Sequence, residues 1–297
     1  QIQPVKQNEV QPENIYQMVG LNSFAAAQNN PKVECLNTQY RSIPTIGDLV
    51  SKFSYNGIVK PNRSQSSQKP LNLGFKISSI NYIGFKTELL DNLYGLDAID
   101  ESAFHLYSAI FGYEYASYIS RKVEESNPSE QYSIGIVCPY KKQADSIKQM
   151  IELRDISNES CKVQCGTVHS FQGDECDIMI VVLNPPINVG KNSHVNNQNI
   201  INVAVSRAKD YVFFLVPDNI TQGFPIRDVL GSLSGDEKNV LFCNKIEKVM
   251  FGQEDYIEKH TNVTCHMPVN VYYEPSSLYE VRKDDSAVDI QINEQFR

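Results

Sequence analysis

Apolar and polar residues alternate along this chain in two recurring patterns. Short apolar runs such as S-I-G-I-V-C at 133–138 are typical of strands that are covered on both faces. Longer stretches, in which apolar residues recur three and four positions apart, predict helices. The strands predicted in this way are 75–83, 133–138, 163–168, 178–183 and 211–216, and the helices are 46–53, 102–125 and 140–153. Because strands and helices alternate, we expect an α/β fold in which crossover helices connect parallel strands.

Segments of weaker pattern lie before and between these elements. A helical pattern over residues 11–30 ends at Pro31, and residues 33–36 predict a short strand. Residues 60–72 are rich in proline, serine, glutamine and asparagine, and this composition predicts a mobile loop. Residues 84–100 have no clear period and resemble an insertion.

A more polar tail follows the last predicted strand and covers residues 218–297. Its pattern predicts a helix near 236–249 and a hairpin around V-N-V-Y-Y-E-P-S-S-L-Y-E-V-R at 269–282. Three roles stay open for this tail: it could brace the edge of the sheet, contact a partner or extend a nucleic-acid path.

Composition narrows the class of protein. With 41% hydrophobic and 10% aromatic residues, the chain of 297 residues can build a packed core. Its net charge of -8 means that any contact with nucleic acid must use a local basic groove. Seven cysteines without C-x-x-C pairs favour reduced thiols and a cytoplasmic protein. No signal peptide and no apolar run of membrane-spanning length occur, so we expect no membrane partner.

Four short polar blocks fall at predicted strand ends or strand-to-helix turns. The first is Gln39-Tyr40-Arg41. Its aromatic ring can stack on a base, and its guanidinium can fork onto phosphate oxygens. The same residues also fit an ordinary strand-end tyrosine beside a surface arginine.

The second block, Pro139-Tyr140-Lys141-Lys142, opens a predicted helix directly after a buried strand. The free N–H groups of the first turn and the two lysines suit a nucleic-acid phosphate. A solvated first turn is the alternative. Lysines at this end oppose the helix dipole, which favours an anionic partner.

The third block, G-T-V-H-S-F-Q-G-D-E at 166–175, places two glycines around hydroxyls, an imidazole, an amide and two carboxylates. A packed core does not need that density of short polar groups. His169 lies close enough in sequence to Cys161, Cys165 and Cys176 to raise the question of a zinc site. Their spacing fits no common zinc finger, and strand geometry would place them on both faces of a sheet, so we expect no metal site.

The fourth block runs from Asn202 to Lys209 and includes Arg207, which lies just before a predicted buried strand. An arginine at this position can reach a nucleotide phosphate and stabilise the charge that develops in phosphoryl transfer. A cation that meets the dipole at a helix C-terminus is the alternative. With the third block, this block places acceptors and cations at the ends of parallel strands, where nucleotides and nucleic acids bind in open α/β sheets.

The order and spacing of the four blocks resemble those of the superfamily 1 (1B) helicases. The motifs T-Q-Y-R-x-x-P, P-Y-K-K-Q, G-T-V-H-S-F-Q-G-D-E-x-D and N-V-A-V-S-R-A-K are similar to those of the nonsense-mediated-decay helicase and its DNA-acting and bacterial relatives. The opening Q-I-Q-P-V resembles the tail of motif III in that family. At the level of motifs, the resemblance covers residues 1–5 and 33–217.

This resemblance implies two RecA-like domains with ATP in the cleft between them, and the chain is similar to the second, C-terminal domain. Residues 1–32 would then be the tail of the first domain and a linker. Residues 33–217 would form the second RecA-like domain, with helices on both faces of its sheet and an insertion at about 55–100. Residues 218–297 would be a C-terminal extension.

Roles for individual residues also follow from the resemblance. Arg41 and Arg207 would reach the γ-phosphate, which Gln1 would sense from the edge of the missing domain. The other nucleotide-contacting residues would be Tyr40, stacked on adenine, together with Gln39, Gly173, Glu175 and Lys209. We expect the two arginines to converge on a single pocket at one edge of the sheet.

A second group of residues would line the path of a single strand: Pro139, Tyr140, Lys141, Thr167, His169 and Ser170. Such grooves follow phosphates and tolerate many sequences. The implied partners are single-stranded nucleic acid, with DNA slightly favoured over RNA, and the first RecA-like domain of the same parent chain. The implied cofactor is ATP with Mg²⁺, held mainly by that missing domain.

Two parts of an ATPase are absent from the sequence. Gly190-Lys191 lacks the rest of a G-x-x-x-x-G-K-[S/T] phosphate loop, and no acidic strand motif for Mg²⁺ occurs. We therefore expect that this chain alone does not hydrolyse ATP, whereas its parent is an ATP-driven helicase or translocase. Two other functions stay open: a nucleotide-free RecA-like interaction module, and a phosphotransferase or nuclease that uses Asp174, Glu175 and Asp177.

Overall fold

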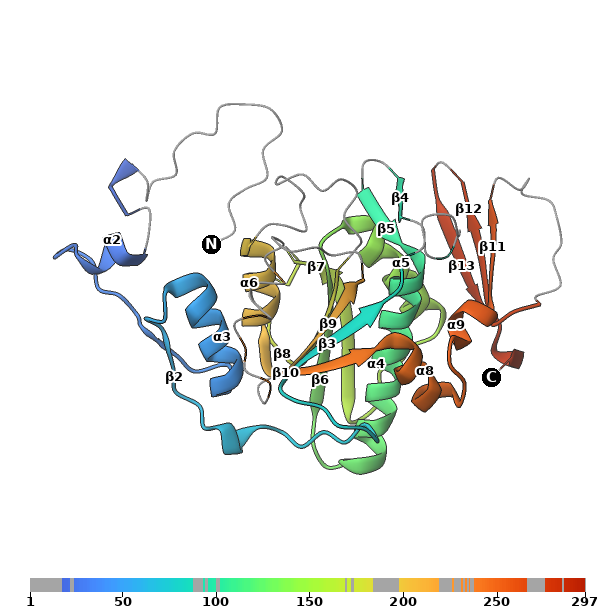
Figure 1. Ribbon diagram of the computed structural model, residues 1–297, viewed down its shortest axis with the longest axis horizontal. Helices are drawn as coiled ribbons and strands as arrows, with labels where there is room; N and C mark the ends of the chain where they lie inside the picture. Colours follow the sequence, from blue (N-terminus) through green and yellow to red (C-terminus); the bar gives the residue numbers. More distant parts are fainter. Residues whose placement is uncertain are drawn as a thin grey trace.

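Six parallel strands form the central sheet of the protein (Figure 1). They lie in the order β10-β3-β9-β8-β6-β7, and every neighbouring pair is parallel. The expected α/β fold with a parallel sheet is therefore confirmed. The bounds of the strands are β3 Ile80–Phe85, β6 Tyr132–Cys138, β7 Cys161–Thr167, β8 Cys176–Val182, β9 Ala208–Pro217 and β10 Lys238–Phe242. The computed structural model describes residues 18–21, 24–87, 93, 96–99, 102–168, 170–171, 174–183, 198–218, 226, 231, 233, 235, 238–265, 276–284 and 286–296.

Helices cover both faces of this sheet. Figure 1 shows α3 and α6 on one side and α4, α5 and α8 on the other. The helices are α2 Phe24–Gln28, α3 Pro44–Tyr55, α4 Leu106–Ser126, α5 Lys141–Leu153, α6 Gln198–Ser206, α8 Cys243–Phe251 and α9 Tyr256–Lys259, with short 3₁₀ turns η1 Gln65–Ser67 and η3 Glu294–Phe296. The smaller strands are β1 Thr38–Gln39, β2 Lys60–Pro61, β4 Leu96–Ile99, β5 Ser102–His105, β11 Thr261–Cys265, β12 Tyr279–Lys283 and β13 Val288–Ile292.

The core consists of two apolar clusters, one on each face of the sheet. Successive residues of a strand point to opposite faces, so Ile180 of β8 belongs to one cluster while Met179 and Val181 belong to the other. Because both faces are covered, β8 has no solvent-facing positions and all its residues are buried. This arrangement explains the continuous apolar runs in the sequence.

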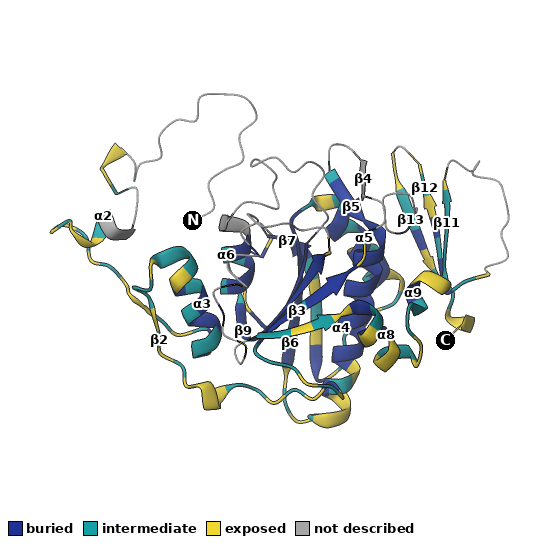
Figure 2. Ribbon diagram, viewed as in Figure 1, coloured by how far each residue is buried: buried dark blue, intermediate teal, exposed yellow. Residues whose placement is uncertain are grey.

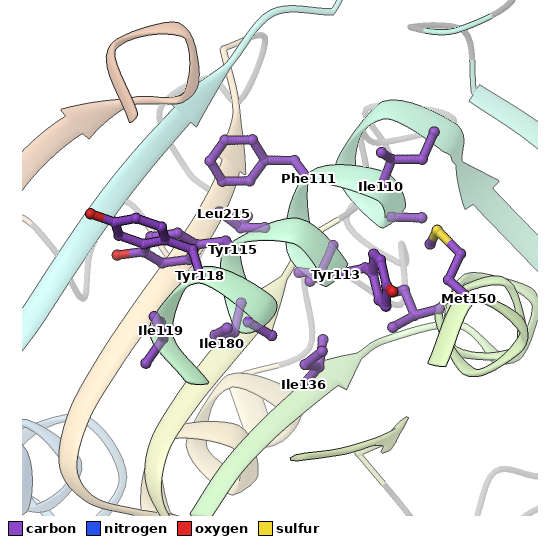
Figure 3. Close-up of a cluster of buried hydrophobic side chains, with 14 of the residues drawn as sticks. Ile110, Phe111, Tyr113, Tyr115, Tyr118, Ile119, Ile136, Met150, Ile180 and Leu215 are labelled. Atoms are coloured by element: carbon purple, nitrogen blue, oxygen red, sulfur yellow. The ribbon is translucent and has the colours of Figure 1, made fainter. Parts of the chain in front are cut away.

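Helix α4 is enclosed along most of its length, and every residue from Leu106 to Ser120 is buried (Figure 2). Its aromatic side chains pack against one another and against the strands (Figure 3). The rings of Phe111 and Tyr115 stack with 5.8 Å between their centroids, and Tyr115 meets Phe213 of β9 edge-on at 5.3 Å. The helix is also covered on the side that faces away from the sheet. This second cover explains why apolar residues occur around the whole circumference of the helix.

The predicted strand at 33–36 is wrong. This segment has no regular structure, and strand β1 follows it at Thr38–Gln39. Leu36 has 87% of its surface exposed, so this apolar residue lies on the outside of the protein instead of in a sheet. Of the helix predicted over 11–30, residues 11–17 and 22–23 lie outside the described residues, and the described remainder contains the short helix α2.

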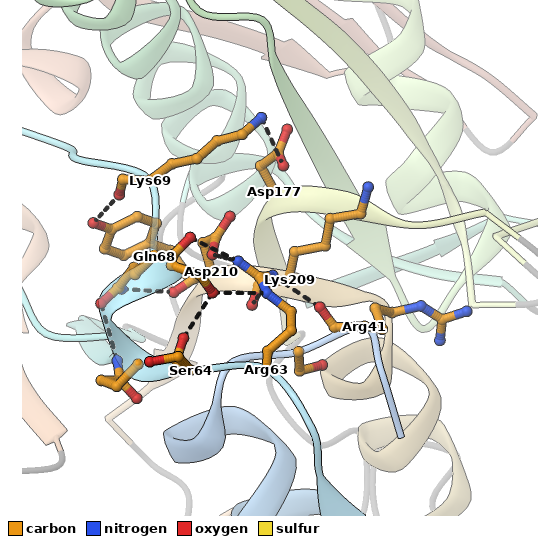
Figure 4. Close-up of polar contacts among 12 residues, drawn as sticks. Arg41, Arg63, Ser64, Gln68, Lys69, Asp177, Lys209 and Asp210 are labelled. Atoms are coloured by element: carbon orange, nitrogen blue, oxygen red, sulfur yellow. Dashed lines mark hydrogen bonds and ion pairs between the residues drawn. The ribbon is translucent and has the colours of Figure 1, made fainter. Parts of the chain in front are cut away.

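The predicted loop at 60–72 contains only the short elements β2 and η1, and its polar side chains tie it to the sheet. We call residues 61–70 the strap, because they run past the amino ends of the central strands (Figure 4). Gln68 donates from Nε2 to the carbonyl of Asp210 at 2.9 Å, and Lys69 pairs with Asp177 at 3.0 Å. Composition predicted a mobile loop here, and it could not reveal these bonds.

The polar tail contributes to the main sheet. Strand β10 pairs with β3 at the edge of the sheet, and helix α8 follows it directly, where the sequence predicted only a helix near 236–249. Strand β3 itself lies within the range 55–100 that was expected to be an insertion. Nothing in the fold tests the predicted domain boundaries, so they stay predictions.

A hairpin does occur in the tail, but later than predicted. It joins β12 and β13, whereas the prediction placed it at 269–282, and residues 266–275 lie outside the described residues. The turn is organised by Asp284, whose side chain accepts hydrogen bonds from the N–H groups of Ser286 and Ala287 at 2.7 Å each. An aspartate that binds the backbone in this way is a turn signal, and here it outweighs the Pro-Ser-Ser segment.

A buried polar contact joins this hairpin to α4. The hydroxyl of Tyr279 donates to the carboxylate of Glu114, and Arg154 lies 3.6 Å from the same carboxylate. Both Tyr279 and Glu114 are fully buried. Burial raises the pKa of Tyr279 well above its ordinary value, and the nearby Glu114 raises it further, so the hydroxyl keeps its proton and serves as a donor.

Replacing this donor tests how far the tail stabilises the domain. We expect Tyr279→Phe to lower the free energy of unfolding by about 1–3 kcal/mol, because a buried carboxylate loses a hydrogen bond. Urea unfolding would measure the change. The matched control is Tyr256→Phe, whose hydroxyl makes an exposed bond to the carbonyl of Phe296 at 3.2 Å and should matter by less than about 0.5 kcal/mol. Equal effects of the two substitutions would contradict this role.

Candidate nucleotide and nucleic-acid sites

A pocket of about 940 Å³ opens at the amino ends of β8 and β9. Glu175 directly precedes β8, Arg207 directly precedes β9, and Arg41 follows β1. The sequence-predicted nucleotide residues that the structure describes all line this pocket: Gln39, Tyr40, Arg41, Glu175, Arg207 and Lys209. Arg41 and Arg207 thus face one cavity. The general rule for open α/β sheets places ligands at the carboxyl ends of the strands, whereas this pocket lies at the other end.

Glu175 is the centre of charge in this pocket. One carboxylate oxygen lies 2.7 Å from Nε of Arg41, and the other lies 2.7 Å from Nζ of Lys209. Hydrogen bonds from Lys209 and Arg41 lower the pKa of Glu175 from its ordinary value, and the bond from Lys209 has the larger effect. The carboxylate therefore stays ionised and holds two cations beside the cavity.

Arg207 is placed differently from the other cations. Its Nε atom is buried and has no hydrogen-bond partner among the described residues. Burial lowers the pKa of Arg207, and the positive charge of Arg41 lowers it further. An arginine keeps its charge in proteins even so. A buried cationic donor without a partner, on the wall of a cavity, fits an anionic ligand.

The turn that carries Arg41 is shaped by Gln39. The amide oxygen of Gln39 accepts hydrogen bonds from the N–H groups of Arg41 and Ser42 at 3.0 and 2.9 Å. The side chain lies against α3, where a Cβ at Gly47 would come within 2.3 Å of its Nε2. Gln39 was predicted to contact the nucleotide, but its amide is already used inside the turn. Tyr40, in contrast, is 69% exposed and presents its ring to the pocket.

Hydrogen bonds then attach this turn to the segment before β9 and to its first residues. The hydroxyl of Ser42 donates to the carbonyl of Ala208 at 2.7 Å, and the N–H of Ile43 donates to the carbonyl of Lys209 at 3.0 Å. Arg41 donates from Nη1 to the carbonyl of Ser206 at 2.8 Å. These bonds bring the first and fourth polar blocks together, although they are far apart in sequence.

The predicted nucleic-acid residues lie at the opposite end of the sheet. Pro139 and Tyr140 follow β6, and Lys141 begins α5. Thr167 ends β7, and its carbonyl accepts a hydrogen bond from the N–H of Ser170 at 3.0 Å. With about 3.3 Å of rise per residue, a strand the length of β6 puts roughly 20 Å between the two groups.

A short connection joins the two ends. Residues 168–175 lead from the carboxyl end of β7 to the amino end of β8. Phe171 is buried on the face of the sheet within this segment. A Cβ at Gly135 of β6 would come within 3.0 Å of the Phe171 ring, so the glycine makes room for the connection.

Three predicted site residues, Gln1, His169 and Gly173, lie outside the described residues. In the part of the chain that the structure does describe, no group of three His, Cys, Asp or Glu side chains could hold a metal ion. Asp177 accepts hydrogen bonds from Ser133 and pairs with Lys69, and Glu175 pairs with two cations, so these carboxylates face separate partners. That arrangement does not favour the nuclease alternative.

Sequence reasoning missed Arg63, which also lines the pocket. It lies in the strap, which was predicted to be a mobile loop, and it touches the backbone of Arg41. An arginine in a segment rich in proline, serine and glutamine is expected to be a surface residue, so nothing in the sequence around Arg63 indicated its place in the pocket.

Comparison with known proteins now assigns the fold. Residues 21–218, about two thirds of the chain, match the AAA domain family AAA_12. The chain belongs to this family. Its members form the C-terminal RecA-like domain of superfamily 1 helicases, so the resemblance inferred from the motifs is confirmed. The six-stranded parallel sheet with its flanking helices is a RecA-like fold.

Individual relatives cover smaller parts of the family match. The replicase polyprotein 1ab of Alphamesonivirus 1 is 36% identical over 104 residues, which are 35% of this chain and 2% of the polyprotein. The putative helicase mov-10-B.1 of Danio rerio is 38% identical over 91 residues, or 26% of this chain and 8% of the helicase. The chain thus spans only a small part of these relatives.

Among solved structures, the C-terminal domain of a possible DNA helicase from Lactobacillus plantarum is similar at 10% identity and a TM-score of 0.35. The match covers 68% of this chain and 98% of that domain. Within the described residues, no helix has the length and apolar character needed to span a bilayer.

The charge arrangement around Glu175 can be tested by titration. We expect the pKa of Glu175, followed by NMR of its carboxyl carbon, to lie below the ordinary glutamate value of about 4.3. Lys209→Met should raise this pKa, because it removes the largest cause of the lowering, and the control Lys162→Met, an exposed site on β7, should leave it unchanged. A Glu175 pKa that does not respond to loss of Lys209 would contradict the ion-pair geometry.

Proposed function

We propose that this chain is the second motor lobe of an ATP-dependent superfamily 1 helicase or translocase. In this proposal, ATP and Mg²⁺ are held mainly by a first RecA-like lobe of the parent protein. The pocket at the amino ends of β8 and β9 faces the γ-phosphate from the other side of the cleft. The chain supplies cations to that pocket and part of a nucleic-acid groove, and it does not hydrolyse ATP alone.

One observation carries the proposal: the buried, unpartnered Nε of Arg207 lies on a wall that is strongly cationic. The described lining residues include three cations, Arg41, Arg207 and Lys209, but one carboxylate, Glu175, and the fourth cation, Arg63, pairs with Asp210. A protein with a net charge of -8 has no general reason to concentrate cations there. A phosphate group satisfies both the vacant donor and the local excess of positive charge.

The chemistry follows from what these side chains can do. When bound, the nucleotide supplies the phosphoryl group that is transferred to water, and Mg²⁺ neutralises part of its charge. Arg207 and Arg41 stabilise the negative charge that develops on the γ-phosphate oxygens in the transition state. Tyr40 offers its exposed ring to the adenine base, and Glu175 keeps Arg41 and Lys209 in place.

The opposite end of the sheet is proposed to contact the single strand. Lys141 is exposed at the first turn of α5, where backbone N–H groups and the helix dipole also favour a phosphate. The connection 168–175 lies between this end and the nucleotide pocket.

Hydrolysis by the full-length parent tests the role of the arginines. We expect Arg207→Ala to lower the kcat of nucleic-acid-stimulated ATP hydrolysis by about 10³-fold or more, because a charge-stabilising contact to the transferring phosphoryl group is lost. Arg41→Ala should also lower kcat. Arg121→Ala, an exposed arginine on α4, serves as the control and should leave kcat unchanged. Normal stimulated hydrolysis in the Arg207→Ala protein would refute the assignment.

Binding of single strands by the same full-length protein tests the other end of the sheet. Lys141→Gln should weaken binding and reduce the slope of log affinity against log salt by about 0.7, as expected when one phosphate contact is lost. Lys148→Gln is the matched control, since Lys148 is exposed on the same helix but farther from the strand ends. Running DNA and RNA in parallel decides the substrate. Identical salt slopes for both variants would count against this groove.

A further inference from the structure

We propose that Arg63 is a positioning residue that sets where Arg41 sits in the nucleotide pocket. The inference rests on the proposed function, because it assigns Arg63 a role through an arginine that contacts phosphate. Arg63 belongs to the strap, a segment outside the four polar blocks of the sequence. Figure 4 shows its guanidinium between the backbone of Arg41 and the side chain of Asp210.

All the donors of the Arg63 guanidinium are used. Nη1 donates to the carbonyl of Arg41 at 2.8 Å and to the carbonyl of Lys209 at 3.3 Å. Nη2 donates to Oδ1 of Asp210 at 2.8 Å and to the carbonyl of Ser67 at 2.9 Å, and Nε donates to Oγ of Ser67 at 3.2 Å. The group therefore bridges three segments: the turn that carries Arg41, the start of β9 and the strap itself.

The partners of Arg63 on both sides, Asp210 and the strap, are themselves held in the fold. The side chain of Asp210 is 1% exposed, and burial raises its pKa while the charge of Arg63 acts to lower it. The strap is tied to α3 through a hydrogen bond from Thr45 to Gln65 at 2.9 Å, and to β9 through Gln68. Movement of the Arg41 carbonyl thus requires breaking bonds whose other partners are fixed in the fold.

The chemistry requires an arginine at this position. A guanidinium presents its donors as a rigid planar fork, and two carbonyls from different segments accept from one nitrogen of that fork here. A lysine ammonium is a point charge with three donors and cannot span the same set of acceptors. Arg63 therefore adds a second link between the Arg41 and Lys209 backbones, beside the hydrogen bond from Ile43 to the carbonyl of Lys209.

Misplacement of a catalytic group by about 1 Å can cost about 10²-fold in rate. We expect Arg63→Ala in the full-length parent to lower the kcat of nucleic-acid-stimulated ATP hydrolysis by about 10–100-fold. The KM for ATP should change by less than about threefold, because ground-state binding depends mainly on the other lobe. Arg63→Lys should keep the charge but not restore kcat.

A double-mutant cycle with Arg41 separates positioning from a general structural effect. If Arg63 acts through Arg41, then Arg63→Ala should lower kcat by less than about twofold in a protein that already carries Arg41→Ala. The same loss in both backgrounds, or normal kcat in the Arg63→Ala protein, would overturn the inference. Normal kcat in the Arg41→Ala protein would instead overturn the proposed function, and this inference with it.

Loss of Arg63 leaves Asp210 buried without its cation, which can destabilise the fold. The cycle is therefore repeated with Arg63→Ala/Asp210→Asn, in which no uncompensated buried charge remains. Thermal unfolding of each protein reports whether it is folded at the assay temperature. A folded double variant with normal kcat would overturn the inference, and a folded variant with the same loss of kcat would support it.

Discussion

Hydrogen bonds between the turn at 41–43 and the backbone from Ser206 to Lys209 shape the pocket at the amino ends of β8 and β9. Ser42 and Ile43 bind the carbonyls of Ala208 and Lys209, and Arg41 binds the carbonyl of Ser206. These bonds place one arginine beside the strand end from which Arg207 extends. The position of Glu175 depends on this contact, because its carboxylate spans from Arg41 to Lys209.

The two candidate surfaces lie at opposite ends of the same strands, and this separation shapes any coupling between them. A change at the amino end can reach the carboxyl end through the rigid strands or through residues 168–175. Strand β8, which runs between the two ends, is buried along its whole length and cannot shift independently of its neighbours. Within the described part of this connection, Val168 and Phe171 are buried against the sheet, and the N–H of Val168 donates to the carbonyl of Cys138 at 3.3 Å.

Burial elsewhere keeps this geometry stable. Helix α4 is covered by the sheet on one side and by the C-terminal elements on the other, and the Tyr279–Glu114 contact lies at this second boundary. The polar tail at 218–297 is therefore an integral part of the domain, although its sequence pattern predicted an extension. The six-stranded sheet itself is completed by β10, a strand from that tail.

The apolar pattern predicted five of the six central strands and their parallel arrangement, because burial on both faces leaves a continuous apolar run such as the one in β6, but it missed the edge strand β10. The four polar blocks predicted the family, and they identified Arg41, Glu175 and Arg207 as candidate residues of one site. Tertiary structure alone decided which end of the sheet each block occupies, and it turned Gln39 inward. It also revealed Arg63, since a guanidinium that binds distant carbonyls leaves no local trace in a sequence.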